Sequence, residues 1–153
     1  MENKKKIRIH AVAGFVALTT VSIFWLSTVT VELLGDAATV AAVKTWVLIG
    51  MAVLIPAMIV AGASGFSLGK GWKSPVVARK KRRMRIIAAN GLLVLVPSAF
   101  VLSRFADAGR FDTLFAIVQT IELMAGAVNI ALLSLNMRDG LSLRRKAIPA
   151  RAK

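Results

Sequence analysis

The single histidine of this chain, His10, lies where a basic segment passes into a long apolar run. Neutral imidazole is a standard axial ligand of haem iron. Helical spacing of three and four residues places Gly14 and Ala17 on the same stripe as His10. Small residues permit the close approach of a neighbouring helix or of a flat cofactor. We therefore predict a haem ligand at His10; a half-hydrated histidine in the headgroup region is the alternative interpretation.

Three basic side chains are predicted to lie at the same membrane depth as His10: Arg8, Arg83 and Arg85. Arginine pairs well with carboxylates, and haem carries two propionates. The predicted haem b site therefore consists of His10 as the metal ligand, with Gly14, Ala17, Arg8, Arg83 and Arg85 around the cofactor. One histidine per chain cannot supply both axial ligands. The sixth position would be filled by a methionine or by a second chain, or left open.

A second polar group falls on the last apolar segment, where Gln119, Glu122 and Asn129 lie within a roughly 100° arc of one helix. An ionisable side chain within a membrane is costly, so we expect Glu122 to face the bundle interior, a cavity or a subunit interface. Two uses remain open. The carboxyl can take up a proton, or the three side chains can serve as interhelical hydrogen-bonding partners.

Four apolar segments must position these residues, at about 9–34, 44–68, 86–104 and 113–135. Each qualifies or nearly qualifies as a span of about 20 residues, the length that crosses about 30 Å of hydrocarbon. The predicted fold is an all-α membrane protein, a single domain of four transmembrane helices. Proline removes a backbone donor, so we expect bends at Pro56 and Pro97.

The charge pattern predicts the orientation of the spans. The chain is 57% hydrophobic yet carries a net charge of +14, and Lys and Arg gather before residue 9, in the loop 69–85 and in the tail 138–153. Because Lys and Arg resist translocation, we predict a bacterial inner-membrane protein with both termini in the cytoplasm. Charges that punctuate apolar runs indicate topology and not nucleic-acid binding. The basic loop also suits anionic lipid headgroups.

The first apolar segment is longer than a signal-peptide core of about 7–15 residues, so we expect it to be retained. A weak repeat relates Lys5–Leu18 to Arg82–Leu95 and predicts two parallel helical-hairpin repeats, with chance similarity as the alternative. Ile87 stands in the second segment where the first has His10. The histidine therefore belongs to one half and not to the shared scaffold.

Small residues recur at four-residue intervals in the second apolar segment, at Ala57, Ala61, Gly65 and Gly69. Such a ridge predicts close helix contact, either within the bundle or between chains. Four spans bury only part of their surface against one another, and polar groups facing lipid are unfavourable. The ridge, the polar stripe centred on Glu122 and the lone histidine together predict a homodimer.

Several function classes are excluded or disfavoured by what the sequence lacks. There is no cysteine, which excludes disulfides, thiolate metal sites and covalently attached c-type haem. Phosphate-binding, dinucleotide-binding, zinc-protease and nucleophile-elbow motifs are also absent from the sequence. We therefore predict no catalytic residue, and a conventional enzyme is not expected.

The stretch Arg8–Trp25, within a four-span layout, resembles compact b-type haem membrane proteins of bacteria. This resemblance implies one haem b per chain and a role in haem handling, redox or gas sensing, or electron transfer. The single histidine departs from four-helix b-type cytochromes, whose several intramembrane histidines pair across helices. That departure argues against electron transfer through two stacked haems. The alternative is a cofactor-free interaction subunit or a small proton-coupled transporter that uses Glu122.

Overall fold

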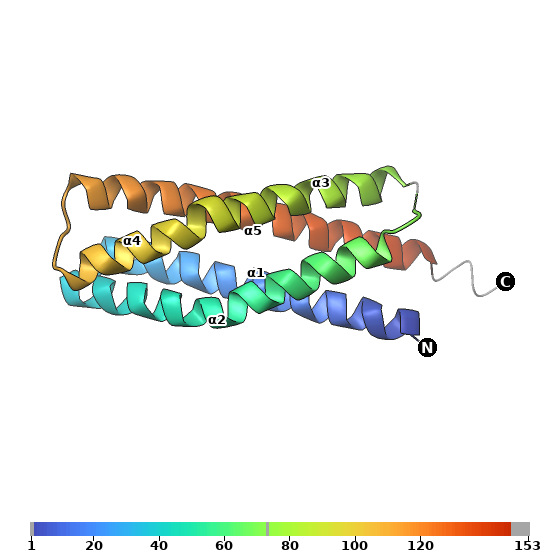
Figure 1. Ribbon diagram of the computed structural model, residues 1–153, viewed down its shortest axis with the longest axis horizontal. Coiled ribbons are helices and arrows are strands. Elements are labelled where there is room, and N and C mark those ends of the chain that lie inside the picture. Colours follow the sequence, from blue (N-terminus) through green and yellow to red (C-terminus); the bar gives the residue numbers. More distant parts are fainter. Residues whose placement is uncertain (1, 73, 148–153) are drawn as a thin grey trace.

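The computed structural model describes residues 2–72 and 74–147, which form four long helical rods. The elements are α1 (Glu2–Leu34), α2 (Ala37–Leu68), α3 (Pro75–Asn90), the π-helical segment η1 (Gly91–Leu95), α4 (Val96–Asp107) and α5 (Thr113–Ala147). The segments α3, η1 and α4 follow one another without a break and make one rod (Figure 1). All four rods are long and apolar enough to cross a membrane. The predicted all-α four-helix fold is therefore confirmed.

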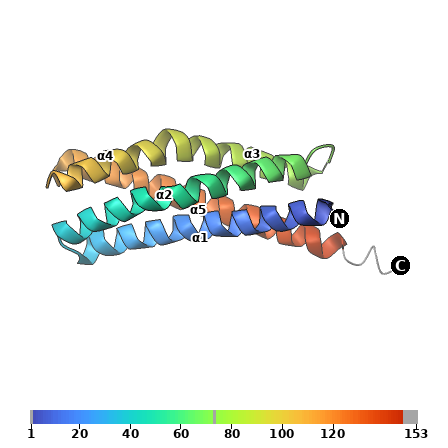
Figure 2. The same cartoon turned by 60° about the horizontal axis from the view of Figure 1, so that its bottom comes forward.

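The rods form two helical hairpins that lie side by side (Figures 1 and 2). One hairpin is α1 with α2, and the other is the α3–η1–α4 rod with α5; contacts of α1 with α5 and of α2 with α4 join them. Both chain ends and the α2–α3 connection lie at one end of the bundle, here called the basic end (Figure 1). The connections at residues 35–36 and 108–112 lie at the opposite end, here called the far end.

The helices extend beyond the apolar segments that the sequence marks. The predicted loop 69–85 is shorter in the structure, because α3 begins at Pro75 and residues 75–85 are helical. Proline suits the first helical turn, where its missing N–H has no intrahelical partner, and Lys and Arg are good helix formers. Hydropathy locates the part of a helix that lies in hydrocarbon, and it does not locate the ends of the helix.

The last helix shows the same extension at the basic end. α5 continues to Ala147 and so includes the first part of the predicted tail 138–153. Residues 148–153 of that tail, and Lys73 of the predicted loop, lie outside the described residues.

Two aspartates begin helices at the far end. The Asp36 carboxylate accepts a hydrogen bond from the Thr39 backbone amide at 2.8 Å and another from the Thr39 hydroxyl, which starts α2. Asp112 accepts from the Phe115 amide at 3.1 Å and pairs with Arg110 at 2.8 Å. The Thr39 hydroxyl and amide hold the pKa of Asp36 below its usual range, and Arg110 and the Phe115 amide do so for Asp112. Both carboxylates therefore remain ionised as caps.

The π-helical segment η1 lies directly before Pro97. The Val96 amide bonds to the Gly91 carbonyl, which is the wider i to i+5 turn of a π-helix. Pro97 has no N–H with which to bond the carbonyl four residues earlier, so the backbone before it must rearrange. At Pro97, where a bend was expected, the structure has this π-helical segment directly before the proline. α2 also contains a proline, Pro56, within one continuous helix that changes direction along its length (Figure 1).

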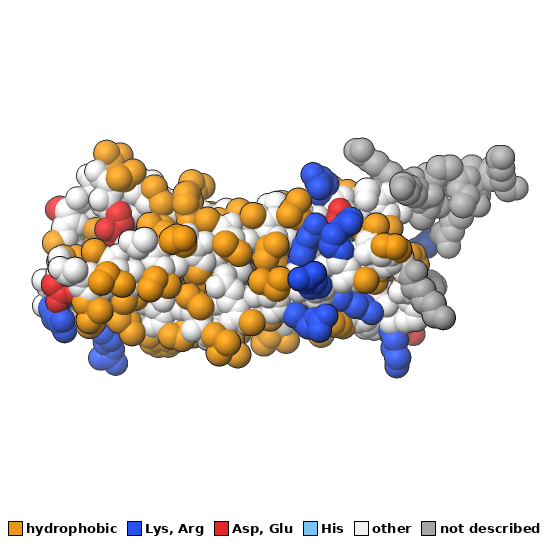
Figure 3. All heavy atoms as spheres, turned by 90° about the horizontal axis from the view of Figure 1, so that it is seen from above, with side chains coloured by type: hydrophobic (Ala, Val, Ile, Leu, Met, Phe, Trp, Pro, Cys, Tyr) orange, Lys and Arg blue, Asp and Glu red, His pale blue; other side chains and the backbone are white. Residues whose placement is uncertain are grey.

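The interior combines alanines with large apolar residues such as Ile87 and Leu102, and many other large apolar side chains lie on the exterior. Several alanines are at most 9% exposed: Ala13, Ala17, Ala61, Ala99, Ala106 and Ala125. Large side chains such as Ile23 and Leu93 are 58% and 71% exposed. On the face shown in Figure 3, apolar atoms cover most of the length, and Lys and Arg gather toward the basic end. This inversion of a soluble protein's surface suits a bundle whose solvent is lipid.

Candidate functional site

A lysine and a glutamate meet inside the bundle. The Lys44 Nζ donates to the Glu122 Oε2 at 2.7 Å, and the two side chains are 1% and 12% exposed. They come from α2 and α5, which are diagonal neighbours with no close backbone contact in the described residues, so two long side chains bridge the centre. Removing two charges from water costs several kcal/mol for each ion, which only a close partner offsets. Apolar side chains at these two positions would avoid this desolvation penalty.

Further polar groups surround this ion pair. The Gln119 Nε2 donates to the Glu122 Oε2 at 3.3 Å, and Gln119 is 5% exposed. In the described part of the chain, the buried Gln119 Oε1 has no hydrogen-bond partner. The Lys44 ammonium has three N–H donors, of which the described contacts use one. Glu32 of α1 lies within electrostatic reach of both charges. The site therefore has unused donors and an unused acceptor beside an ion pair.

Two asparagines join α3 and α5 nearer the basic end. The Asn90 Nδ2 donates to the Asn129 Oδ1 at 2.8 Å and to the Ala125 carbonyl at 2.9 Å. The Asn129 Nδ2 donates in turn to the Ile87 carbonyl at 3.4 Å, and Asn129 is 4% exposed. Both amides are paired with each other and with the backbone, so this contact stabilises helix packing without a charge.

His10 is half-buried against α2. Its Nδ1 lies 3.0 Å from the Ala61 carbonyl oxygen and 3.1 Å from the Ser64 Oγ. A Cβ on Gly65 would lie 2.9 Å from the His10 Cε1, so the ring fits here because residue 65 has no side chain. A carbonyl only accepts hydrogen bonds, so this contact places a proton on Nδ1. In the neutral ring, Nε2 then keeps its lone pair.

The predicted small residues above His10 have different surroundings. Ala17 is fully buried by helix packing. A Cβ on Gly14 would meet no atom within 4 Å, so space is open beside that residue. No group of three or more His, Asp or Glu side chains in the described residues is arranged to hold a metal ion.

The three predicted propionate partners are not brought together at His10 by any described contact. Arg8 and Arg85 are exposed. Arg83 donates to the Asp139 Oδ2 at 2.7 Å, and Arg79 approaches the same oxygen at 3.4 Å. Asp139 therefore fixes α5 to α3 at the basic end.

The small-residue ridge of α2 is used mostly within the chain. Ala61 and Gly69 are buried, Gly65 contacts His10, and Ala57 is half-buried at the outer surface. Of the two uses that the spacing leaves open, the structure shows packing inside the bundle.

Sequence reasoning missed three residues of these contacts: Lys44, Asn90 and Asp139. Lys44 is a charged residue at the start of the second apolar segment, and nothing in its position identifies Glu122 as its partner. Asn90 is a polar residue in an apolar run, and Asp139 is the one acidic residue in the segment 138–153. The sequence shows that these three residues are polar or charged. It does not show their partners, because those depend on which helices are neighbours.

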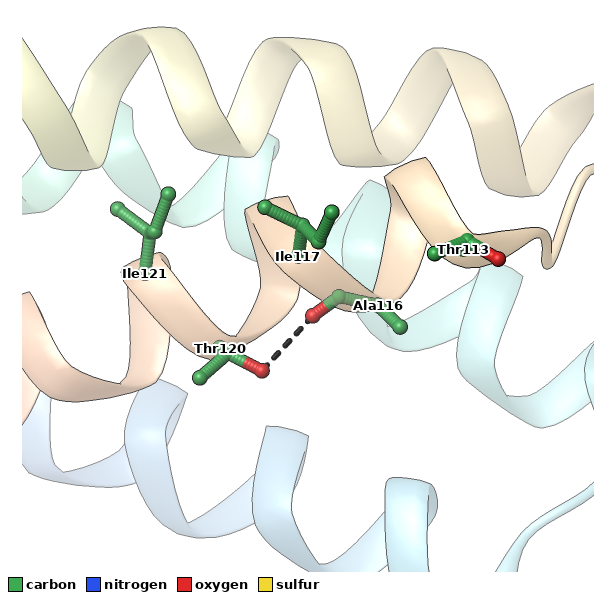
Figure 4. Close-up of a pocket in the computed structure, with 5 residues that line it drawn as sticks. All are labelled: Thr113, Ala116, Ile117, Thr120 and Ile121. Atoms are coloured by element: carbon green, nitrogen blue, oxygen red, sulfur yellow. Dashed lines mark hydrogen bonds between the residues drawn. The ribbon is translucent and has the colours of Figure 1, made fainter.

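One shallow hollow lies on the surface of α5 (Figure 4). It has a volume of about 320 Å³ and is lined by Thr113, Ala116, Ile117, Thr120 and Ile121. The Thr120 hydroxyl donates to the Ala116 carbonyl at 2.8 Å, so it is already satisfied. Among the described residues, no charged side chain lines this hollow, and the Thr120 hydroxyl is already bonded. The hollow is therefore a poor candidate for a binding or catalytic site.

The fold and these contacts define a class: a four-helix bundle whose rods are long and apolar enough to cross a membrane, with a buried ion pair between α2 and α5 in the half nearer the far end. Comparison with known proteins finds no matching family model, no matching curated protein and no matching solved structure.

Proposed function

We propose that this chain is a small proton-coupled membrane transporter in which Glu122 binds the proton and Lys44 is its counter-charge. The Lys44–Glu122 ion pair carries the proposal, because ionisable side chains inside membrane bundles are costly and mark ion or proton pathways. Neutral amides can join two helices without a charge, as Asn90 and Asn129 do. Helix packing alone therefore does not require an ion pair.

Proton binding at this site has a mechanical consequence. Protonation of Glu122 removes the negative charge that lies 2.7 Å from Lys44, whose side chain is 1% exposed. An unpaired ammonium cannot stay in that environment at low cost, so Lys44 must move or lose its own proton. Because Lys44 and Glu122 belong to different hairpins, proton binding is coupled to the contact between the hairpins. Movement of one half against the other is the basis of alternating access.

Polar groups continue along the interior side of α5 toward the basic end. Asn129 and Asp139 are buried, and the Asn136 Oδ1 is a buried acceptor with no partner in the described residues. Buried acceptors of this kind recruit water, because leaving them unpaired costs free energy. A hydrated track on α5 would connect Glu122 with the basic end.

Proton flux in liposomes tests the proposal. Purified protein is reconstituted with an internal pH-sensitive dye, a panel of candidate substrates is added outside, and a potassium diffusion potential drives protons inward. We expect faster acidification than in protein-free liposomes, background rates for Glu122→Gln, and near-normal rates for the control Asp107→Asn, which neutralises an exposed carboxylate of α4. Background rates with the unaltered protein, or unchanged rates with folded Glu122→Gln, would refute it. Inactive protein that retains a stable partner on purification would favour the interaction subunit.

Haem b binding through His10 is our second proposal, and one observation favours it. A hydrogen bond from Nδ1 to a main-chain carbonyl is the outer contact that orients metal-bound histidines through Nε2. The described residues supply this ligand geometry but not the propionate partners, since Arg83 binds Asp139. Protein from haem-replete cells should show a Soret band that is lost in His10→Ala. A colourless protein, or a band unchanged in His10→Ala, would contradict this role.

We also propose a homodimer in a bacterial inner membrane, with both termini in the cytoplasm and the basic end against anionic lipid headgroups. The gathering of Lys and Arg at the end with both termini supports this orientation. Since Ala61 and Gly69 are buried, the dimer contact must use other residues. Single cysteines at exposed Trp72 and Phe111 should react with impermeant reagent from opposite sides of the membrane.

A further inference from the structure

A groove runs between α1 and α2 on the outer surface of the bundle. It is shallow and open to the outside, with a volume of about 430 Å³. Its apolar walls come from both helices: Ile9, Val12, Val16, Pro56 and Val60. Val12 is 57% exposed and Val60 is 41% exposed, so the groove opens outward from the bundle. In a membrane-spanning protein this side faces lipid.

The shape and the charge of the groove follow from three residues. Ala13 and Ala57 contribute only methyl groups, which leaves the space between the bulkier walls. Arg8 lines the same groove toward the basic end. In the described residues the Arg8 guanidinium has no hydrogen bond or ion pair. Lys4 and Lys5 are exposed on the preceding turn of α1 and so extend the positive charge outward.

We propose that this groove binds one anionic phospholipid, with an acyl chain between α1 and α2 and the phosphate on Arg8. The apolar walls match hydrocarbon, and the guanidinium matches a phosphate oxygen pair. The cationic rim favours a lipid over a second copy of this chain, because a second copy would bring its own Arg8 and lysines to a symmetric contact. The site is independent of the Lys44–Glu122 pair and of His10.

Native mass spectrometry in mild detergent tests the proposal with phosphatidylglycerol as the probe and phosphatidylcholine as the neutral comparison. The unaltered protein should retain one phosphatidylglycerol in preference to phosphatidylcholine. Arg8→Gln should weaken that binding about fivefold, the effect of about 1 kcal/mol per basic residue. The control Arg85→Gln removes an exposed charge from α3, outside the groove, and should leave binding near normal.

Two filling variants separate the groove from surface charge. Ala57→Phe and Val60→Phe should each occupy the groove and reduce phosphatidylglycerol retention while Arg8 is intact. Val60 is exposed, so this variant should fold even if Ala57→Phe does not. Retention unchanged in a folded filling variant, or reduced equally by Arg85→Gln, would overturn the proposal. A filling variant that instead dissociates a dimer would show that a second copy occupies the groove, which also overturns it.

Discussion

Two ion pairs tie α5 to the rest of the bundle, and they differ in how many cations share the carboxylate and in where along the bundle they lie. Lys44 and Glu122 pair across the bundle at 2.7 Å, with the lysine 1% exposed and the neutral Gln119 amide as the second donor to the Glu122 Oε2. Asp139 and Arg83 also pair at 2.7 Å, but Arg79 shares the same carboxylate and is 52% exposed. The comparison teaches that distance alone does not set the importance of an ion pair. The loss in free energy of unfolding on removing one partner depends on whether the other charge is left buried and unpaired.

Loss of the carboxylate from the Lys44–Glu122 pair should have the largest effect on stability. Glu122→Leu leaves Lys44 buried without its partner, and breaking a buried pair in this way costs about 3–5 kcal/mol. The free energy of unfolding in mixed micelles, measured by detergent titration, should fall by that amount. A loss below about 1 kcal/mol would place Lys44 in contact with water or headgroups and would remove the contrast between the two pairs.

The same kind of change at the basic end should cost less. Asp139→Asn removes the carboxylate from Arg83 and Arg79, and we expect a loss of about 1–3 kcal/mol, the cost of an unsatisfied polar partner. Both arginines lie at the basic end, where headgroup phosphates can replace Asp139. The same titration measures the effect. An Asp139→Asn loss that exceeds that of Glu122→Leu would reverse the comparison.

The neutral asparagine contact sets a smaller reference value. A double-mutant cycle with Asn90→Ala and Asn129→Ala isolates their shared hydrogen bond, for which we expect a coupling of about 0.6 kcal/mol. This value states what a membrane bundle gains from a polar contact without charge. A coupling above about 2 kcal/mol would mean that the amides, and not the ion pair, dominate the polar interior.

The smallest effect should come from the Asp36 cap, and it should depend on pH. Hydrogen bonds from Thr39 lower the pKa of Asp36 in the folded state, so the cap stabilises the protein above the unfolded-state pKa. The contribution is lost as the pH falls through the lowered folded-state pKa. Stability of the protein and of Asp36→Ala, measured across acidic pH, should therefore differ at neutral pH and converge in acid. A difference independent of pH would show that the carboxylate charge is not what caps α2.

The sequence predicts the fold well because a membrane limits the choice of structure. Span length and hydropathy alone indicate four helices, and the polar arc on the last span places Gln119, Glu122 and Asn129 on its interior side, where they are found. The basic segment 79–85 was assigned to a loop because hydropathy reports lipid contact, whereas Lys and Arg continue a helix readily.

The partners within the site were not predictable from the same patterns. Lys44 has no sequence relation to Glu122, since the contact depends on α2 and α5 lying diagonally opposite. His10 was predicted to lie at the depth of three arginines, yet its ring contacts Gly65 and the Ala61 carbonyl instead. A helical wheel gives the direction of a side chain within one helix. It does not say which helix lies in that direction.

The central claim is that the Lys44–Glu122 pair is present for function and not for stability. The double variant Lys44→Met with Glu122→Leu removes both charges and leaves neither unpaired, so it should fold with nearly unchanged or greater stability. Its proton flux in liposomes is the most direct test. We predict a folded bundle that moves protons no faster than protein-free liposomes. Proton flux equal to that of the unaltered protein would contradict the account.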